Sequence, residues 1–302
     1  RLAPHIERLK SRSPLVSAAM LEQEGIKPGK HMGQLLKAAE RMAINEDRHD
    51  SEPILAKLKT LPLWQEARCA TSCVDPAYRS LHQTLLIEGL KPIQELSPSV
   101  VRVLYTPSYT SVVLRISGEK WEVTEAMVHK ISALSSPEGI VAEVRMPSFI
   151  PLGAVSRVLA LDGVSDPGNM GVLLRTALAL GWQQIYLLPG CCDPFNEKVL
   201  RAARGAHFRL ALSKGSVDAL HRWVKEEKVQ PLVADLRGTP PDQVTVADRR
   251  LLVLGNEAHG ASEAIGHFCA PVAIPMPGNM ESLNVAVAGG ILLYLLMETP
   301  PT

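Results

Sequence analysis

The chain has 302 residues, of which 46% are hydrophobic and 21% are charged, and its formal net charge is +1. This composition is typical of a globular protein of about two domains with a sizeable buried core, and it excludes long disordered regions. A nearly neutral chain is not uniformly basic, so a nucleic-acid partner requires a local basic face.

The chain contains an odd number of cysteines, and their spacing is not that of a metal site. The five are Cys69, Cys73, Cys191, Cys192 and Cys269. This usage favours reduced thiols over a disulfide framework, and we expect no bound metal. The longest apolar run, from Val285 to Met297, is too short to cross a bilayer, so no membrane partner is expected. Because the sequence starts at Arg1 without a methionine, the compartment stays open between a reducing cytosol and an organelle.

Residues 1–66 are predicted to form a polar helical segment punctuated by prolines. A Pro/Gly turn precedes an amphipathic helix with one apolar side, made of Met32, Leu35, Leu36, Ala39 and Met42. A second short helix is predicted after Pro53. The stretch from Pro14 to Gln65 resembles the C-terminal tail of the tRNA nucleotidyltransferase/poly(A) polymerase family, through Gly25, Pro28, Gly29, Gly33 and Leu36. The resemblance implies an RNA-associated helical appendage without catalytic residues.

Residues 67–147 are predicted to form a compact α/β domain of short strands and helices. Leu85, Leu86 and Ile87 mark a strand that leads into a helix, and VVRVLY marks a second strand. VTEAMVHKISAL is predicted to be helical, and a turn at SSPEG leads into a last strand.

From residue 148 onward, six continuous apolar strands are predicted: VLALDGV, QIYLLP, FRLALS, PLVADL, LLVLGNE and PVAIPM. Apolar strands joined mostly by helices indicate a parallel sheet covered on both faces, which binds ligands beyond the carboxyl ends of its strands. The sequence contains neither a dinucleotide-binding nor a P-loop glycine motif.

Three polar loops follow strands of this predicted sheet. The first contains Asn169 and Arg175, the second contains Gly255, Glu257, His259 and Gly260, and the third runs from Ala273 to Asn284. Each loop taken alone also fits a simpler interpretation. Asn169 and Ser282 are good helix N-caps, Arg175 is typical of an exposed helix face, and His259 is typical of a loop. The glycines at 255 and 260 allow the backbone to approach a ligand closely.

Together the loops resemble the three motifs of the SpoU (TrmH) family of RNA methyltransferases, in the SPOUT superfamily. The matching patterns are N-x-G-x-x-x-R-T-A from Asn169, G-N-E-x-x-G from Gly255, and I-P-M-x-G-x-x-x-S-L-N from Ile274 to Asn284. The 67–147 region also resembles the small L30e-like substrate-binding domain of that family. The resemblance implies a parallel sheet with a C-terminal trefoil knot, where sequence periodicity alone favours an ordinary unknotted sheet.

The resemblance further implies an S-adenosylmethionine-dependent enzyme that methylates a ribose 2′-hydroxyl in structured RNA, either tRNA or rRNA. It implies these catalytic residues: Asn169, Arg175, Glu257, Ser282 and Asn284. The cofactor would be held at Asp235, Gly255, Asn256, Ile274, Met276 and Leu283. Because arginine is a poor proton acceptor, Arg175 is expected to bind RNA phosphate and polarise the hydroxyl, and action as a general base would require a strongly perturbed site.

Two other functions stay open at this point, a non-catalytic RNA-binding or assembly factor with the same fold, and a base methyltransferase. A homodimer is expected through the apolar face of the last helix, made of Val285, Val287, Ile291, Leu292 and Leu295. RNA is expected to bind a basic helix that contains Lys198, Arg201 and Arg204, although a solvated face is the simpler interpretation.

Overall fold

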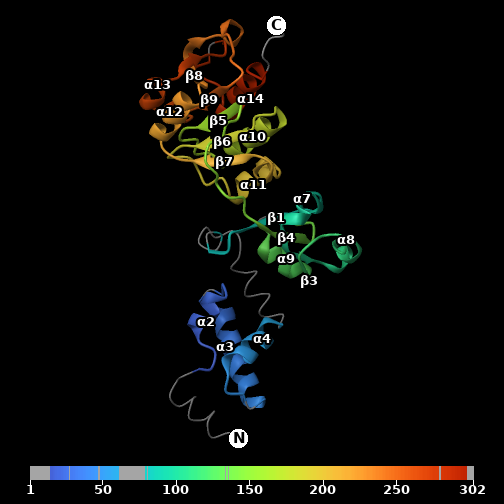
Figure 1. Ribbon diagram of the computed structural model, residues 1–302. Helices are drawn as coiled ribbons and strands as arrows, with labels where there is room; N and C mark the ends of the chain where they lie inside the picture. The colour runs from blue at the N-terminus through green and yellow to red at the C-terminus, as the bar shows by residue number, and fades with distance from the viewer. Residues whose placement is uncertain are drawn as a thin grey trace. The chain divides into compact units, whose positions relative to one another are not determined.

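The computed structural model describes residues 14–26, 28–46, 48–60, 79, 81–132, 134, 136–278 and 280–297. The chain is divided into two compact units, residues 1–146 and residues 147–302. Figure 1 shows the elements of each unit. Cys69, Cys73 and the end of the expected second helix, residues 61–65, lie outside the described residues.

Three helices pack together near the N-terminus: α2 (Ala18–Gln23), α3 (Lys30–Asn45) and α4 (Ser51–Lys59). The predicted amphipathic helix is confirmed as α3, whose Met32, Leu35 and Ala39 are buried against residues of α2 and α4. Helix α4 begins two residues before Pro53, which occupies the first turn, where a proline is tolerated because its missing N–H would have no partner there.

The remaining described residues of the first unit include a four-stranded sheet in the order β1-β4-β2-β3. Its elements are β1 (Thr84–Glu88), α7 (Leu90–Glu95), η1 (Ser97–Ser99), β2 (Val100–Tyr105), η2 (Pro107–Tyr109), α8 (Thr110–Val113), β3 (Glu119–Glu122), α9 (Glu125–Ile131) and β4 (Ile140–Arg145). Strand β4 is antiparallel to β1 and β2, whereas β2 and β3 are parallel. The three expected strands are confirmed. The edge strand β3 was missed because its sequence, EKWE, has a single apolar residue.

The second unit is built on a six-stranded sheet in which every pair of neighbouring strands is parallel. Its strands are β5 (Arg157–Leu161), β6 (Gln184–Leu187), β7 (Ala211–Lys214), β8 (Gln230–Thr239), β9 (Arg250–Leu254) and β10 (Ala270–Val272). The spatial order is β10-β8-β9-β5-β6-β7. All six strands predicted from apolar runs are present, and the α/β class with a parallel sheet is confirmed.

Helices cover both faces of this sheet (Figure 1). The helices are α10 (Pro167–Ala179), α11 (Glu197–Ala203), α12 (Val217–Glu226), α13 (Glu263–Gly266) and α14 (Val285–Leu295), with short turns η3 (Ala206–Phe208) and η4 (Pro241–Gln243). Residues of α12 and α13 pack on Leu251 and Val253 of β9. On the other face, α10 contacts both α11 and α14, and Gly289 of α14 lies against Leu254. In the part of the chain that is described, no helix is both long and apolar enough to cross a membrane.

Candidate active site

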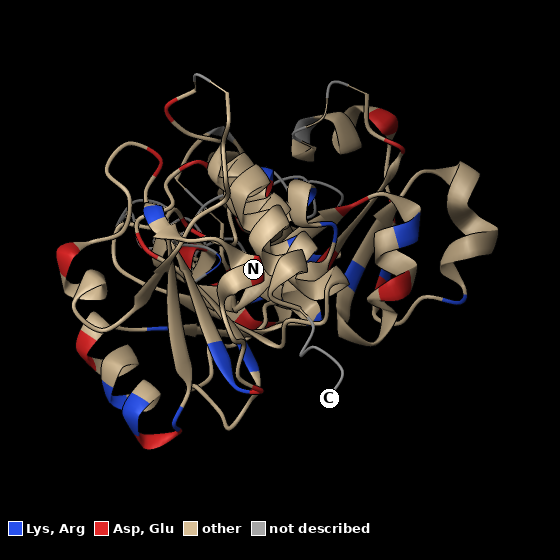
Figure 2. Ribbon diagram, turned by 90° about the horizontal axis from the view of Figure 1, so that it is seen from above, with Lys and Arg blue, Asp and Glu red and all other residues tan. Residues whose placement is uncertain are grey.

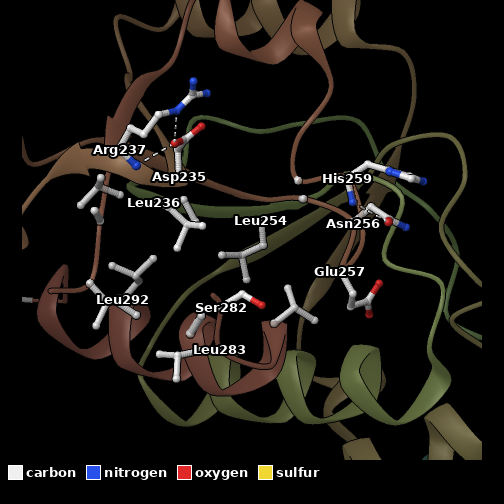
Figure 3. Close-up of a pocket in the computed structure, with 18 of the residues that line it drawn as sticks. Asp235, Leu236, Arg237, Leu254, Asn256, Glu257, His259, Ser282, Leu283 and Leu292 are labelled. Atoms are coloured by element: carbon white, nitrogen blue, oxygen red, sulfur yellow. Dashed lines mark hydrogen bonds and ion pairs between the residues drawn. The ribbon is translucent and has the colours of Figure 1, made fainter. Parts of the chain in front are cut away.

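A cavity of about 450 Å³ lies at the carboxyl ends of β8, β9 and β10. Figure 3 shows Asp235, Leu254, Glu257 and Ser282 around this hollow. Its wall combines aliphatic side chains with few polar groups, which is typical of a site for a small molecule. The lining residues are Ala234, Asp235, Leu236, Arg237, Leu254, Gly255, Asn256, Glu257, Ala258, His259, Gly260, Val272, Ala273, Ile274, Met276, Ser282, Leu283, Val285, Ala288 and Leu292.

The loop after β9 is closed tightly on itself. The backbones of Asn256 and Gly260 exchange two hydrogen bonds of 2.9 Å, and the Asn256 side chain donates to Gly163 O over 2.8 Å. A Cβ on Gly255 would lie 2.1 Å from the Ala261 nitrogen. The close approach expected at Gly255 is therefore to the loop's own backbone, and it fixes the position of Glu257 at the cavity.

Helix α10 is capped by Asp166, whose Oδ1 accepts from the Asn169 N–H over 2.7 Å. The expectation that Asn169 caps this helix is wrong, because the helix begins at Pro167 and Asn169 lies in its first turn. Since Asp166 satisfies the backbone donor, the side-chain amide of Asn169 is left available for contacts with other loops.

Helix α14 is capped by Asn284, whose Oδ1 accepts from the N–H groups of Ala286 and Val287 at 2.9 and 3.3 Å. The expected N-cap, Ser282, is wrong because the helix begins three residues later, at Val285. Ser282 instead lines the cavity, and its hydroxyl is turned toward the side where Glu257 lies (Figure 3).

A chain of side-chain hydrogen bonds joins the three polar loops. Asn284 donates from Nδ2 to Asn169 Oδ1 over 3.0 Å, and Asn169 donates from Nδ2 to Glu257 Oε1 over 2.9 Å. The residues come from α14, α10 and the loop after β9. Three segments that are far apart in the sequence therefore place their polar groups beside one cavity.

The structure brings most of the predicted site residues together. All six residues expected to hold a cofactor line the cavity, namely Asp235, Gly255, Asn256, Ile274, Met276 and Leu283. Glu257 and Ser282 line it as well, and Asn169 and Asn284 reach it through Glu257. Arg175 is exposed on α10 and is not among the lining residues. Lys198, Arg201 and Arg204 are exposed on or next to α11, also away from the lining residues.

Asp235 and Arg237 form a polar group on the β8 side of the cavity. Asp235 Oδ1 accepts from the Arg237 backbone N–H over 2.8 Å and from its Nε over 3.4 Å. The backbone hydrogen bond, together with the guanidinium, lowers the pKa of Asp235. A carboxylate held in its ionised form suits the hydroxyl donors of a ribose.

Several lining residues were not predicted from the sequence. Leu254, Val285, Ala288 and Leu292 form part of the aliphatic wall. Leu254 directly precedes Gly255 and Val285 directly follows Asn284, so the predicted residues already indicated this part of the chain. Leu292 lies more than two turns into α14, and only the seating of that helix on β9 brings it to the cavity.

S-adenosylmethionine combines an adenosine with a charged methionine tail, and the cavity offers suitable groups for both parts. Its volume is in the range of small-molecule sites, aliphatic residues surround the hollow, and Asp235 and Glu257 place carboxylates in its wall. Within the described ranges, no group of His, Cys, Asp or Glu is arranged to hold a metal ion.

Comparisons with known proteins agree with this geometry. The sequence model of the SpoU rRNA Methylase family matches residues 156–294. The 23S rRNA (guanosine(2553)-2′-O)-methyltransferase RlmP of Bacillus subtilis is 32% identical over 224 residues, which cover 72% of this chain and 90% of that protein. A crystal structure of an AdoMet-bound rRNA methyltransferase from Sinorhizobium meliloti has a TM-score of 0.69 at 26% identity, covering 78% of this chain and 94% of that one.

Proposed function

The chain belongs to the SpoU rRNA methylase family, and on this premise we propose that it transfers the methyl group of S-adenosylmethionine to a ribose 2′-hydroxyl of RNA. The observation that supports the activity most directly is the hydrogen-bonded chain Asn284–Asn169–Glu257 at the edge of the cavity. The relative from B. subtilis is named for 23S rRNA, which favours ribosomal RNA over tRNA as the substrate.

In this proposal the residues of the cavity wall hold the cofactor. Asp235 would bind the ribose hydroxyls of the adenosine, and the backbone near Gly255, Ile274 and Leu283, which also line the cavity, would hold the cofactor. Asn256 and Met276 complete the pocket. When bound, the cofactor would supply an electrophilic methyl group on a sulfonium. The role of the cavity wall would be to position that group for the acceptor oxygen, because positioning can supply much of the acceleration.

Arg175 is assigned to the RNA and not to the cofactor. The guanidinium is exposed and forms no ion pair with a described residue, and all of its nitrogens are donors. A planar guanidinium matches a phosphate group well. Arg175 would hold the phosphate next to the target ribose and so orient the 2′-hydroxyl.

The basic helix α11 is proposed as a further part of the RNA-binding surface. Lys198 and Arg201 are exposed one turn apart, and Glu197 is the single acid of this helix, 4.0 Å from Arg201. Figure 2 shows Lys and Arg interspersed with Asp and Glu along the ribbon. Because the chain is nearly neutral, a local excess of positive charge on α11 matters for binding phosphate groups. Helix α11 packs on α10, which carries Arg175.

A homodimer through α14 and α10 is proposed from the apolar groups that remain exposed there. Val287 and Tyr294 of α14 are 52% and 61% exposed, and Ile291, Leu295 and Val172 are exposed beside them. The expected face needs one correction, because Val285 and Leu292 point into the fold and are buried. Val172 and Arg175 are three residues apart on α10, so this dimer would bring Arg175 toward the partner's site.

We also propose the finer fold features that the family resemblance implies. The end of α14 is fastened to the sheet, since the guanidinium groups of Arg157 and Arg250 both donate to Met297 O, at 3.1 and 2.9 Å. The C-terminal trefoil knot in residues 148–302 is proposed from the family resemblance alone. Residues 67–147 are proposed as the L30e-like substrate-binding domain, and residues 1–66 as an RNA-associated helical appendage.

The proposal is tested by incubating the full chain with ribosomal RNA and S-adenosylmethionine carrying a labelled methyl group. We expect label in the RNA and cofactor binding with a stoichiometry of one per chain. Cofactor binding without transfer to ribosomal RNA or tRNA would favour the non-catalytic RNA-binding alternative. A chain that binds no cofactor would refute the assignment of the cavity.

A further inference from the structure

The side chain of Asn256 shapes its own loop. Its Oδ1 accepts from the backbone N–H groups of Ala258 and His259, over 2.9 and 3.3 Å, and its Nδ2 donates to Gly163 O over 2.8 Å. Its backbone N–H and carbonyl are paired with those of Gly260. Both atoms of the side-chain amide thus have partners within the protein. Asn256 therefore fastens the start of the loop after β9 to Gly163, two residues beyond the end of β5.

The other end of this loop is fastened to Asp162, the neighbour of Gly163. Asp162 Oδ2 accepts from the Ser262 N–H over 2.7 Å, and the Asp162 N–H donates to Leu254 O over 2.8 Å. Leu254 is the last residue of β9, and Ser262 directly precedes α13. Two consecutive residues that follow β5 therefore hold the loop after β9 at its beginning and at its end.

Asp162 is buried, with 9% of its surface exposed, and it does not line the cavity. Its carboxylate forms no ion pair with the residues that the structure describes, and its printed side-chain contact is the one with the Ser262 N–H. Burying a carboxylate costs free energy unless hydrogen bonds compensate for the lost hydration. The energetically important contact of this side chain is therefore the one to the loop.

The position of Ser262 affects the wall of the cavity because the two ends of the loop touch. A Cβ on Gly255 would lie 2.1 Å from the Ala261 nitrogen, so the backbones at these two residues are in close contact. Ala261 directly precedes Ser262, and every residue from Leu254 to Gly260 lines the cavity. A displacement of Ser262 would therefore move the backbone that forms this wall.

Resting on the proposed function, we propose that Asp162 is a positioning residue for the binding of S-adenosylmethionine. Asp162 does not touch the cofactor. It fixes Ser262, and through Ser262 it holds residues 255–260 in the position that binds the cofactor. Without this hydrogen bond the loop also occupies other positions, and the apparent affinity falls with the fraction of molecules in the binding position.

The test measures S-adenosylmethionine binding to the full chain by calorimetry, for wild type, Asp162→Ala and Asp162→Asn. A hydrogen bond to a charged group contributes enough free energy to change an equilibrium about 10- to 100-fold. We expect the Kd of Asp162→Ala to rise in this range. Asp162→Asn keeps an oxygen acceptor for the Ser262 N–H, so its Kd should stay within about threefold of wild type. Asp218→Ala is the matched control, because Asp218 is exposed on α12 and does not line the cavity.

Hydrogen exchange of the cofactor-free chain supplies an independent measurement. Peptides that cover residues 255–262 should exchange faster in Asp162→Ala than in wild type, and Asp162→Asn should restore the slow exchange. Asp162→Ser, whose hydroxyl is too short to keep the contact, is the second loss variant if Asp162→Ala does not fold.

A merely structural role would lower the melting temperature of the loss variant and leave the cofactor Kd of the folded chain unchanged. That result would overturn the inference, and so would an equal loss of affinity in Asp162→Asn. Wild type that binds no cofactor would instead refute the proposed function. The exchange rates of the loop would still show whether Asp162 holds it, so the two failures are distinguishable.

Discussion

Asn284 donates from its side-chain nitrogen to Asn169 Oδ1 over 3.0 Å, across a separation of 115 residues. The same Asn284 caps helix α14 through its side-chain oxygen. One residue therefore fixes the start of the last helix and orients the polar groups of another loop. Because Asn169 in turn donates to Glu257, this double role couples the position of α14 to the orientation of the Glu257 carboxylate.

The two roles of Asn284 can be separated by substitution. Asn284→Asp keeps an oxygen for the cap, so its stability should stay close to that of wild type. It removes the donor to Asn169 and is expected to lower kcat at unchanged cofactor affinity. Asn284→Ala should lose about 1 kcal/mol of the free energy of unfolding as well. Urea unfolding and single-turnover rates measure both effects. Equal kcat for wild type and Asn284→Asp would contradict a positioning role.

The packing of α14 against α10 and β9 can be tested at two adjacent glycines, Gly289 and Gly290. A Cβ on Gly289 would lie 2.4 Å from Leu173 Cδ2 and 2.6 Å from Leu254 Cδ1, whereas a Cβ on Gly290 would lie 3.8 Å from Thr176 Cγ2. Gly289→Ala should destabilise the fold by about 1–3 kcal/mol and weaken cofactor binding, because Leu254 lines the cavity. Gly290→Ala should be neutral or stabilise by up to about 1 kcal/mol. Thermal unfolding of both variants measures the two changes in stability. Equal stability of the two variants would contradict tight packing at position 289.

The buried His207 predicts a loss of stability in acid. Burial lowers the pKa of His207 from 6.5 to about 4, against the opposing effects of the Pro194 backbone and Asp193. Below pH 6.5 the unfolded chain binds a proton that the folded chain does not. The free energy of unfolding should therefore fall by about 3 kcal/mol between pH 6.5 and pH 4 from this residue alone.

His207→Phe should remove that part of the pH dependence, and the exposed His267→Gln should leave it unchanged. Urea unfolding at several pH values measures the slopes. Parallel slopes for wild type and His207→Phe would show that His207 is not the group responsible.

The proposed RNA-binding surface on α11 is tested with two double variants, each of which removes two positive charges. Lys198→Ala with Arg201→Ala should weaken RNA binding and lower the log–log salt slope by about one per lost phosphate contact. Arg222→Ala with Lys225→Ala removes two cations from α12, on the other face of the sheet, and should change the slope little. Arg204 is left intact because its φ of 46° would complicate the comparison. Equal salt slopes for both variants would place the RNA track elsewhere.

Much of the catalytic unit could be predicted from the sequence because its strands are continuous apolar runs. Buried strands such as Arg157–Leu161 and Arg250–Leu254 have a clear signal, and the polar loops that follow them were found by their motifs. The helix caps were assigned wrongly at Asn169 and Ser282. Several residues near each helix start can cap it, and the choice depends on where the first turn begins.

Features that depend on tertiary packing were harder to predict from the sequence. The edge strand at residues 119–122 is polar, and Leu292 reaches the cavity only because α14 lies on β9. The hydrogen bonds among Asn169, Glu257 and Asn284 also need three loops to meet in space. The sequence predicted many of the residues that lie at the cavity, but it did not predict which of them contact one another.

The central claim is methylation of a ribose oxygen, and the most direct measurement locates the methyl group. Ribosomal RNA is treated with the full chain and labelled S-adenosylmethionine and then digested to nucleosides. The nucleosides are separated, and their masses and fragments are measured by mass spectrometry. The account predicts that the labelled methyl group stays with the ribose when the glycosidic bond is fragmented. A labelled methyl group that leaves with the base would contradict it.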